Sequence, residues 1–192
     1  MSDEHILKLN NIGTVSIETE RCLLRRINNT DCESMYNNWA RLEECSRYFP
    51  FSAATDIESY KRRVEAWIAN YTDKLYFQWI VALKSTNEPI GIMNLGNIEE
   101  NLLMADINYI LSPKYHRMGI MTEAVTAILD FAFTQAGFHR IQAEVFDGNT
   151  ASAALLDKIG FRLEGIARQK YIKNGKFIDT AQYAILDNEF NR

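Results

Sequence analysis

The segment from residue 110 to residue 124, ILSPKYHRMGIMTEA, has the pattern of a strand that turns into a helix. Pro113 ends the strand, and Gly119 removes side-chain bulk where the main chain would approach an anion. A turn of this kind gathers free backbone N–H groups at the positive end of the helix dipole, which favours phosphate. Many such turns bind nothing, so the turn by itself only permits a phosphate site. The pattern G-x-x-x-x-G-K-S/T is absent, which disfavours a P-loop nucleotidase.

A second polar pair follows in NTASAALLDKIGF, residues 149–161. Asn149 and Ser152 stand three residues apart, where a strand is expected to meet a helix. Asn149 is a favourable N-cap, because its side-chain oxygen accepts a hydrogen bond from a free amide of the first helical turn. The polar atoms of both residues equally suit a ligand beside the preceding strand. Spacing does not decide between the cap and the ligand.

A sheet with covering helices must position these two elements, and the hydrophobic pattern predicts one. Period-two alternation and short apolar runs predict strands at residues 20–27, 76–83, 89–95, 102–111, 140–146, 161–172 and 176–186. Helical spacing predicts helices at about 30–40, 56–70, from the residues after Pro113 to a C-cap at Gly137, and 149–159. Capping boxes at Thr30/Glu33 and Thr55/Glu58 are expected to open the first two.

The connections predict how the strands pair. Links that are too short to hold a crossover helix indicate antiparallel pairing for the strands between residues 76 and 111. Asn174-Gly175 predicts a type I′ hairpin between the last two strands. The fold class is therefore α/β (α+β), with a mixed, mostly antiparallel sheet of about seven strands and helices on both faces.

Length, composition and charge bound the class of protein. A chain of 192 residues with 47% hydrophobic and 24% charged residues is typical of a single globular domain, residues 1–192. The net charge of −4 argues against direct nucleic-acid binding. No run of 18 apolar residues predicts a membrane span, and the acidic first residues do not resemble a secretory signal. We therefore expect a cytoplasmic protein that does not bind membranes.

Cysteine and histidine spacing argues against two further chemistries. The cysteines have no C-x-x-C spacing and are expected to be reduced thiols without a nucleophilic role: Cys22, Cys32 and Cys45. The histidines form no metal-ligand spacing: His5, His116 and His139. Neither covalent catalysis by cysteine nor a metal site is predicted.

The two polar segments together, in this order and at this separation, resemble the acetyl-CoA motifs of the GNAT N-acetyltransferases. Within that superfamily the chain is similar to the Rim-type ribosomal-protein N-acetyltransferases, including the opening strand ERCLLR at residues 20–25 and the later pairs Gly165/Arg168 and Asn174/Gly175. The resemblance spans about residues 17–187. It implies a single GNAT domain with a splay at the centre of its sheet. It also implies an enzyme that moves the acetyl group of acetyl-CoA directly to an amine.

The resemblance assigns residues to the cosubstrate, acetyl-CoA. In the family, backbone amides of the turn hold the pyrophosphate, and the pantetheine arm lies between two parallel strands that splay apart. The expected cofactor-binding residues are Ile110, Leu111, His116, Arg117, Met118, Gly119, Ile120, Met121, Thr122, Asn149 and Ser152. His116 and Met121 depart from the family pattern, which has Gln or Arg at the first position and Gly or Ala at the last. Arg117 suits either a CoA phosphate or solvent.

The resemblance also implies catalytic groups. The residue that matches Ser152 lies near the sulfur and protonates the leaving thiolate, whereas the attacking ammonium needs a general base. Asp106 stands at a strand position where relatives often carry an acidic residue, and an exposed carboxylate without a role is the equal alternative. The glutamate that some relatives carry near the position of Tyr171 is missing here. Glu144 is interpreted as a surface residue.

The expected acceptor is an amine, first of all a protein N-terminal α-amino group as on a ribosomal protein. Trp39, Tyr48, Phe49 and Tyr171 are expected to contact it, although most aromatic residues of this region suit the core. A small-molecule amine is an alternative acceptor, such as a polyamine, amino sugar or antibiotic, and a non-catalytic acyl-CoA sensor is the alternative of another class. Four acidic residues near the presumed groove suit any cationic acceptor: Glu43, Glu44, Asp56 and Glu58. A homodimer is compatible with the sequence.

Overall fold

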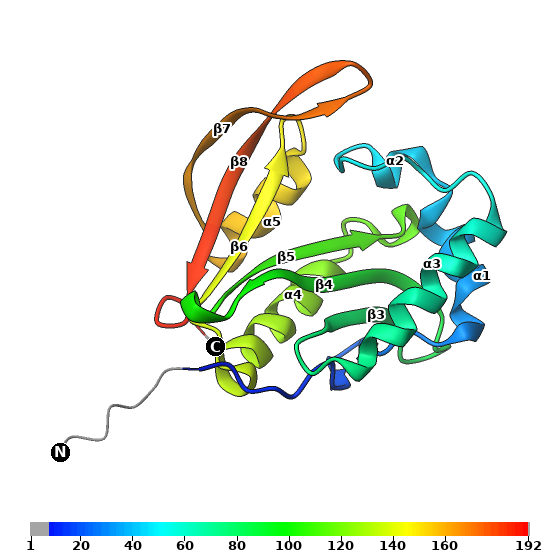
Figure 1. The fold of residues 1–192 in the computed structure, drawn as a ribbon, viewed down its shortest axis with the longest axis horizontal. Coiled ribbons are helices and arrows are strands. Elements are labelled where there is room, and N and C mark those ends of the chain that lie inside the picture. The colour runs from blue at the N-terminus through cyan, green and yellow to red at the C-terminus, as the bar shows by residue number, and fades with distance from the viewer. Residues whose placement is uncertain (1–7, 192) are drawn as a thin grey trace.

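The computed structural model describes residues 8–191, which form one eight-stranded sheet (Figure 1). Its strands are β1 (Ile17–Glu18), β2 (Cys22–Arg25), β3 (Phe77–Leu83), β4 (Pro89–Glu99), β5 (Met104–Leu111), β6 (Arg140–Phe146), β7 (Arg162–Lys173) and β8 (Lys176–Leu186). They lie in the order β1-β2-β3-β4-β5-β6-β8-β7. Neighbours are antiparallel except β5 and β6, which are parallel. The predicted mixed, mostly antiparallel sheet is confirmed, with β1 as an additional short strand.

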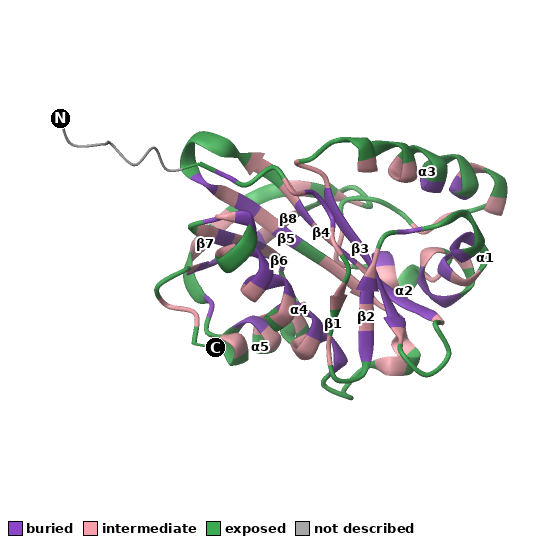
Figure 2. Ribbon diagram, turned by 90° about the horizontal axis from the view of Figure 1, so that it is seen from below, coloured by how far each residue is buried: buried purple, intermediate pink, exposed green. Residues whose placement is uncertain are grey.

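Helices cover both faces of the sheet, as predicted (Figure 2). The α-helices of the described chain are α1 (Cys32–Met35), α2 (Glu43–Ser46), α3 (Ile57–Ala69), α4 (Ile120–Phe131) and α5 (Thr150–Ile159). Side chains of α1 and α3 pack with Ile80 and Ala82 of β3 in one cluster. Those of α4 and α5 pack with Phe77 and Trp79 in the other.

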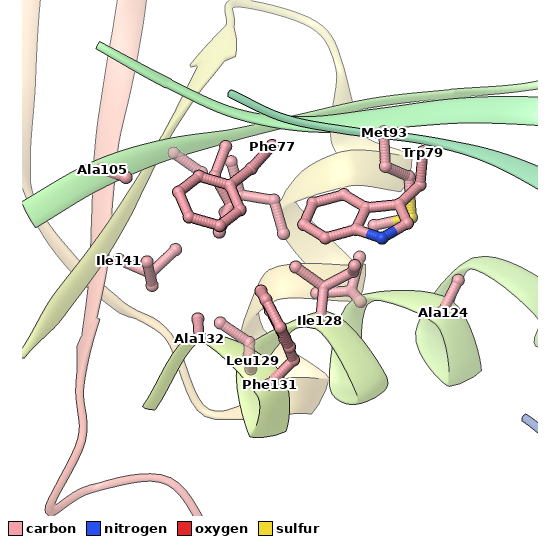
Figure 3. Packing of buried hydrophobic residues seen from close by; sticks show 14 of the residues in the cluster. Phe77, Trp79, Met93, Ala105, Ala124, Ile128, Leu129, Phe131, Ala132 and Ile141 are labelled. Atoms are coloured by element: carbon pink, nitrogen blue, oxygen red, sulfur yellow. The ribbon is translucent and has the colours of Figure 1, made fainter. Parts of the chain in front are cut away.

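Strand β3 explains how one strand serves both clusters. Successive side chains of a strand point to opposite faces, and both faces of β3 are covered, so residues 77–82 are all buried. Phe77 and Trp79 face α4 (Figure 3), where the rings of Trp79 and Phe131 meet edge to face with centroids 5.6 Å apart. Ile128 and Leu129 of α4 are fully buried in the same cluster. This packing fixes α4 beneath the end of β5, where the polar turn lies.

Both predicted capping boxes are wrong, although helical structure begins close to each. Asn28 opens the first helical segment, and the Asp31 carboxylate accepts the Asn28 amide at 2.9 Å. Asp31 is also gripped by Arg25 through two hydrogen bonds of 2.7 and 2.8 Å, an interaction that the local pattern does not reveal. Asp56, rather than Thr55, caps α3 by accepting the Ser59 amide at 2.7 Å.

The predicted helix at 30–40 is helical throughout but is not a single α-helix. Three residues of 3₁₀-helix precede α1, and a π-helical turn follows it at Tyr36–Ala40. The wider turn closes with the Arg41 amide donating to the Tyr36 carbonyl at 3.1 Å. The remaining local predictions hold: Gly137 ends its helix with φ +82°, and Asn174 and Gly175 both have the positive φ of a type I′ turn.

Two observations concern what residues 8–191 do not contain. No helix among them is long and apolar enough to cross a membrane. Nor do they bring together three or more His, Cys, Asp or Glu side chains that could hold a metal ion. His5 lies outside the described residues. The three cysteines are free thiols, and Cys22 and Cys32 are buried.

Candidate active site

The site begins where the two parallel strands separate. β5 and β6 pair only through residues 104–106 and 140–142. Beyond these pairs β5 continues to Leu111 and β6 to Phe146, and the strands diverge (Figure 1). Residues of both strands line a cavity of about 450 Å³ at this point.

The lining of this cavity combines amide, aromatic and charged side chains with the apolar Pro50, Ile92, Met93, Ile107, Ile110 and Ala143 and the hydroxyl of Ser152. Side-chain amides come from Gln78, Asn94, Asn97, Asn108 and Asn149. Aromatic side chains come from Tyr48, Phe49, Phe51, Trp67, Tyr109, Phe146 and Tyr171. Glu144 is the one charged residue of the lining. The cavity therefore presents one carboxylate, which is ion-paired with Lys170, among neutral hydrogen-bonding, aromatic and aliphatic groups.

The turn from β5 into α4 lies at one end of the splay. Arg117 and Gly119 have φ values of +61° and +74°, and Gly119 is the N-cap of α4. Left-handed residues beside right-handed ones turn successive amides toward one side, which makes a concavity for an anion. A Cβ added to Gly119 would meet Nη2 of the Arg21 side chain at 3.6 Å and no main-chain atom outside its chain neighbours within 4 Å, so a flexible guanidinium is what borders this residue.

The other residues predicted to bind the cofactor differ in how far their side chains are exposed to solvent. Ile120 and Met121 are 4% and 6% exposed, so their side chains belong to the core and only their amides reach the helix start. The exposed His116 donates from Nε2 to the Leu111 carbonyl at 3.0 Å, an intramolecular contact that holds the turn. Ile110 lines the cavity.

A residue of the sheet edge braces this turn. Arg21 donates from Nη1 to the Met118 carbonyl at 2.6 Å and from Nε to Glu123 at 2.7 Å, and its amide donates to the same carboxylate at 2.8 Å. Burial would raise the pKa of Glu123, but hydrogen bonds from Thr19 and Arg21 outweigh it and hold the pKa below its usual value. The ionised carboxylate thus ties the first turn of α4 to the start of β2.

Ser152 reaches across the splay to β5. Its Oγ lies 2.7 Å from the hydroxyl oxygen of Tyr109, and both residues line the cavity. Burial raises the pKa of the Tyr109 hydroxyl to about 12, so this group is neutral and able to donate at physiological pH. The pair joins α5 to β5 on the face that α4 and α5 cover.

Asn149 caps a helix and also lines the cavity. It is the N-cap of α5, and its Oδ1 accepts the Ser152 amide at 3.3 Å. Its Nδ2 makes no hydrogen bond to the residues that the structure describes, and the side chain lines the cavity. One end of the amide is used by the fold and the other is available to a ligand.

Glu144 is not the isolated surface residue that the sequence suggested. Its side chain is 21% exposed, lines the cavity and accepts hydrogen bonds from Lys170 and from the Tyr171 hydroxyl, the latter at 2.7 Å. Because Gln142 pairs with Asp106 in register, Glu144 follows on the same face of the sheet, two residues beyond the last parallel pair.

Asp106 lies at the closed end of the splay and outside the cavity lining. Its Oδ2 accepts a hydrogen bond of 2.6 Å from Asn97, which does line the cavity. Its Oδ1 is buried and has no partner among the described residues. A hydrogen bond to Asn97 therefore connects Asp106 to the cavity.

Three of the four predicted acceptor contacts reach the cavity: Tyr48, Phe49 and Tyr171. Trp39 does not, because it is 2% exposed and packs with α1 and α3 in the core. The acidic residues expected near the groove are also absent from the lining: Glu43, Glu44, Asp56 and Glu58. Local aromatic and acidic composition did not distinguish the wall of the cavity from its surroundings.

The polar cavity residues that sequence reasoning missed include Tyr109 and the amides of Gln78, Asn94, Asn97 and Asn108, and it also missed Trp67, Ile92, Met93, Ile107, Ala143 and Phe146. A usable signal existed for the amides, since polar residues inside otherwise apolar strands are unusual where both faces are covered. Tyr109 carried no such signal, because the hydrogen-bond partner of its hydroxyl, Ser152, lies 43 residues away in the sequence.

Comparison with known proteins shows the family to which this chain belongs. The family model described as an acetyltransferase (GNAT) domain matches residues 21–162. The uncharacterized N-acetyltransferase YoaA of Bacillus subtilis (strain 168) is 31% identical, over 88% of this chain and 96% of its own length. Spermidine N(1)-acetyltransferase of Escherichia coli (strain K12) is 24% identical, over 54% of this chain and 55% of its own.

Solved structures show the same architecture. The ribosomal-protein-S5-alanine acetyltransferase of Vibrio fischeri superposes with a TM-score of 0.81 and is 26% identical in sequence. The alignment covers 93% of this chain and 100% of that one.

Proposed function

Because this chain belongs to the GNAT acetyltransferase family and is an N-acetyltransferase, we propose that it moves the acetyl group of acetyl-CoA to a protein N-terminal α-amino group. The relatives include enzymes named for a ribosomal protein and for spermidine, so kinship does not choose the acceptor. The cavity supports the choice, since one carboxylate stands among five side-chain amides. We place the enzyme in the cytoplasm, in keeping with three free cysteines.

The residues of the chain fit acetyl-CoA, which supplies the acetyl group as a thioester. The turn at residues 112–119 and the free first-turn amides of α4 would hold the pyrophosphate, with the exposed Arg117 guanidinium beside them. The unused Nδ2 of Asn149 would donate to the pantetheine arm within the splay. His116 and Met121 leave these backbone amides in place, so their departure from the family pattern does not remove the site.

The two faces of the sheet suit the two proton transfers that acetyl transfer requires. As the N–C bond forms and the C–S bond breaks, the nitrogen must lose a proton and the sulfur must gain one. Ser152 and Tyr109 lie toward the face covered by α4 and α5, where Ser152 donates the proton to the departing sulfur. Glu144 lies toward the opposite face, where its carboxylate takes the proton from the amine.

Asp106 is the second candidate for the base, acting through Asn97. The pH–rate profiles of variants at the two carboxylates distinguish which of them is the base. If Glu144 is the base, Glu144→Gln should lower kcat by about 10²- to 10⁴-fold and remove the acidic limb, whereas Asp106→Asn should retain both. If Asp106→Asn flattens the acidic limb and Glu144→Gln keeps it, Asp106 is the base.

The charge of the cavity favours a peptide N-terminus over a polyamine. A polyamine carries several positive charges, and the loss of water from each on binding costs free energy unless a carboxylate compensates it. The lining offers one carboxylate, Glu144, which already pairs with Lys170, and its amides match the N–H and C=O groups of a peptide backbone. An α-amine also has a pKa of about 8, against about 10.4 for a lysine-type amine, so more of it is neutral and nucleophilic at pH 7.

A direct comparison of acceptors tests this proposal. The kcat/KM for a short peptide with a free N-terminus should exceed that for spermidine, and the same peptide with a blocked N-terminus and an internal lysine should be inactive. A higher kcat/KM for spermidine would assign the small-amine function instead. Binding of acetyl-CoA without turnover on either acceptor would support the acyl-CoA sensor.

A further inference from the structure

Lys173, the last residue of β7, joins two segments that are far apart in the sequence. Its Nζ donates to the carbonyls of Ser46, Phe49 and Phe51 at 2.8, 2.6 and 2.9 Å. An ammonium group has three protons, and all three are used here. These contacts tie the β7–β8 hairpin to the segment that follows α2; the two lie on the same side of the sheet in Figure 1.

The tied segment forms one wall of the cavity. Residues 48–51 all line it, and the rings of Phe49 and Phe51 stack with centroids 4.9 Å apart and planes inclined by 24°. The hairpin supplies the neighbouring wall through Tyr171, two residues before Lys173, whose ring stacks on Phe146 at 5.0 Å. One lysine therefore connects two walls of the same cavity.

The segment has little regular structure to hold its shape. Residues 47–56 contain neither helix nor strand. Within it, residues 48–55 are anchored by two backbone hydrogen bonds, from the Phe49 amide to the Ser46 carbonyl at 3.0 Å and from the Ala54 amide to the Ala40 carbonyl at 2.7 Å. Three charge-assisted bonds from Lys173 outnumber these two neutral ones, and each is about twice as strong.

We infer that Lys173 is a positioning residue that holds the aromatic wall formed by residues 48–51 in place for the acceptor. The inference rests on the proposed function, because it assigns this wall to the acceptor rather than to acetyl-CoA. The assignment follows from which segments form the wall: residues 48–51 follow α2, whereas the phosphate turn and Asn149 lie at the starts of α4 and α5. Tyr48 is the residue of the wall whose ring lies beside Gly148, next to Asn149. Removing the ammonium frees three carbonyls and releases the wall from the hairpin.

Trypsin tests the anchor without any acceptor. Arg47 is exposed within the segment, so cleavage after it reports how often the segment opens. Lys173→Met should speed this cleavage by about 10-fold or more, as expected for the loss of charge-assisted bonds, and Lys173→Arg should restore much of the protection. Lys176→Met is the matched control, since Lys176 is exposed, pairs in register with Lys173 and has a side chain that makes no hydrogen bond to described residues. Equal cleavage of Lys173→Met and the wild type, both folded by circular dichroism, would overturn the inference.

Kinetics then test the assignment to the acceptor. With a free-N-terminal peptide, Lys173→Met should raise the acceptor KM by about 10-fold, and the calorimetric Kd for acetyl-CoA should stay within about twofold of the wild type. Faster cleavage with an unchanged acceptor KM would contradict the assignment, as would a matching loss of acetyl-CoA affinity. If peptides are not acetylated at all, the proposed function fails, and the cleavage rates still decide whether Lys173 anchors the segment.

Discussion

Replacing Tyr109 by phenylalanine isolates the hydroxyl that supports Ser152. The two oxygens lie 2.7 Å apart, and a neutral hydrogen bond contributes about 0.5–1.5 kcal/mol, which corresponds to about 2- to 13-fold in rate. Tyr109→Phe should lower kcat within that range. Ser152→Ala removes the donor itself and should lower kcat by about 10²- to 10⁴-fold.

The double variant gives the sharper result. If Tyr109 acts only through Ser152, Tyr109→Phe should have no further effect once Ser152 is alanine, so the two effects do not multiply. Tyr183→Phe is the control, because Tyr183 is also buried but lies outside the cavity lining. The assay is steady-state release of CoA, followed with a thiol reagent. Multiplying effects would refute the coupling of the two hydroxyls.

The same variant makes a prediction about pH. Because burial raises the pKa of Tyr109 to about 12, the hydroxyl stays protonated throughout the usual assay range. The ratio of wild-type to Tyr109→Phe rates should therefore be constant from about pH 6.5 to about pH 9.5. A ratio that collapses with a midpoint inside this range would show that Tyr109 titrates there, contrary to its burial.

Three further variants test the turn, the cap and the brace. Gly119→Glu adds a side chain with a negative charge at φ +74° and should abolish acetyl-CoA binding in calorimetry; unchanged affinity in a folded variant would rule out the phosphate site. Asn149→Ala should lose about 1 kcal/mol of folding stability from the cap and about 1–3 kcal/mol of acetyl-CoA binding; a loss of stability alone would leave it only a cap. The pKa of Glu123 is depressed in the fold, so its carboxylate stabilises the protein above the unfolded-state value of 4.5, and the benefit is lost as pH falls through the folded value. The difference in unfolding free energy between wild type and Glu123→Gln, measured in urea, should thus shrink as pH falls below 4.5; a difference that persists undiminished would contradict the ionised brace.

Local patterns were sufficient for most of the fold. The alternating and apolar runs located seven strands. Successive side chains of a strand point to opposite faces of the sheet, so a covered face requires an apolar residue at every second position. The Asn174-Gly175 hairpin and the Gly137 cap followed from backbone conformations that few other residues adopt. β1 was missed because two residues are too few to show a period.

Less of the site than of the fold could be predicted from the sequence, because the groups of the site come together only where the strands of the sheet splay apart. Gly119 and Asn149 were identified at strand-to-helix junctions, where local geometry creates free amides and caps. Glu144 was misread because its partners, Lys170 and Tyr171, lie on β7, which reaches β6 only through β8. The prediction for Trp39 was wrong in the opposite direction: Trp39 was expected to contact the acceptor but lies in the core. Aromatic composition alone cannot separate a cavity wall from a core.

The most direct test of the proposed reaction is to find the acetyl group after a single turnover. The enzyme, in excess over acetyl-CoA, is given a peptide that has both a free N-terminus and an internal lysine, in the presence of spermidine. Tandem mass spectrometry of the peptide, the polyamine and the enzyme then locates the transferred acetyl group. Direct transfer to an N-terminal amine predicts acetyl on the peptide α-nitrogen and none retained by the enzyme. Acetyl on spermidine or on the lysine side chain, or an acetylated enzyme formed before the product, would contradict it.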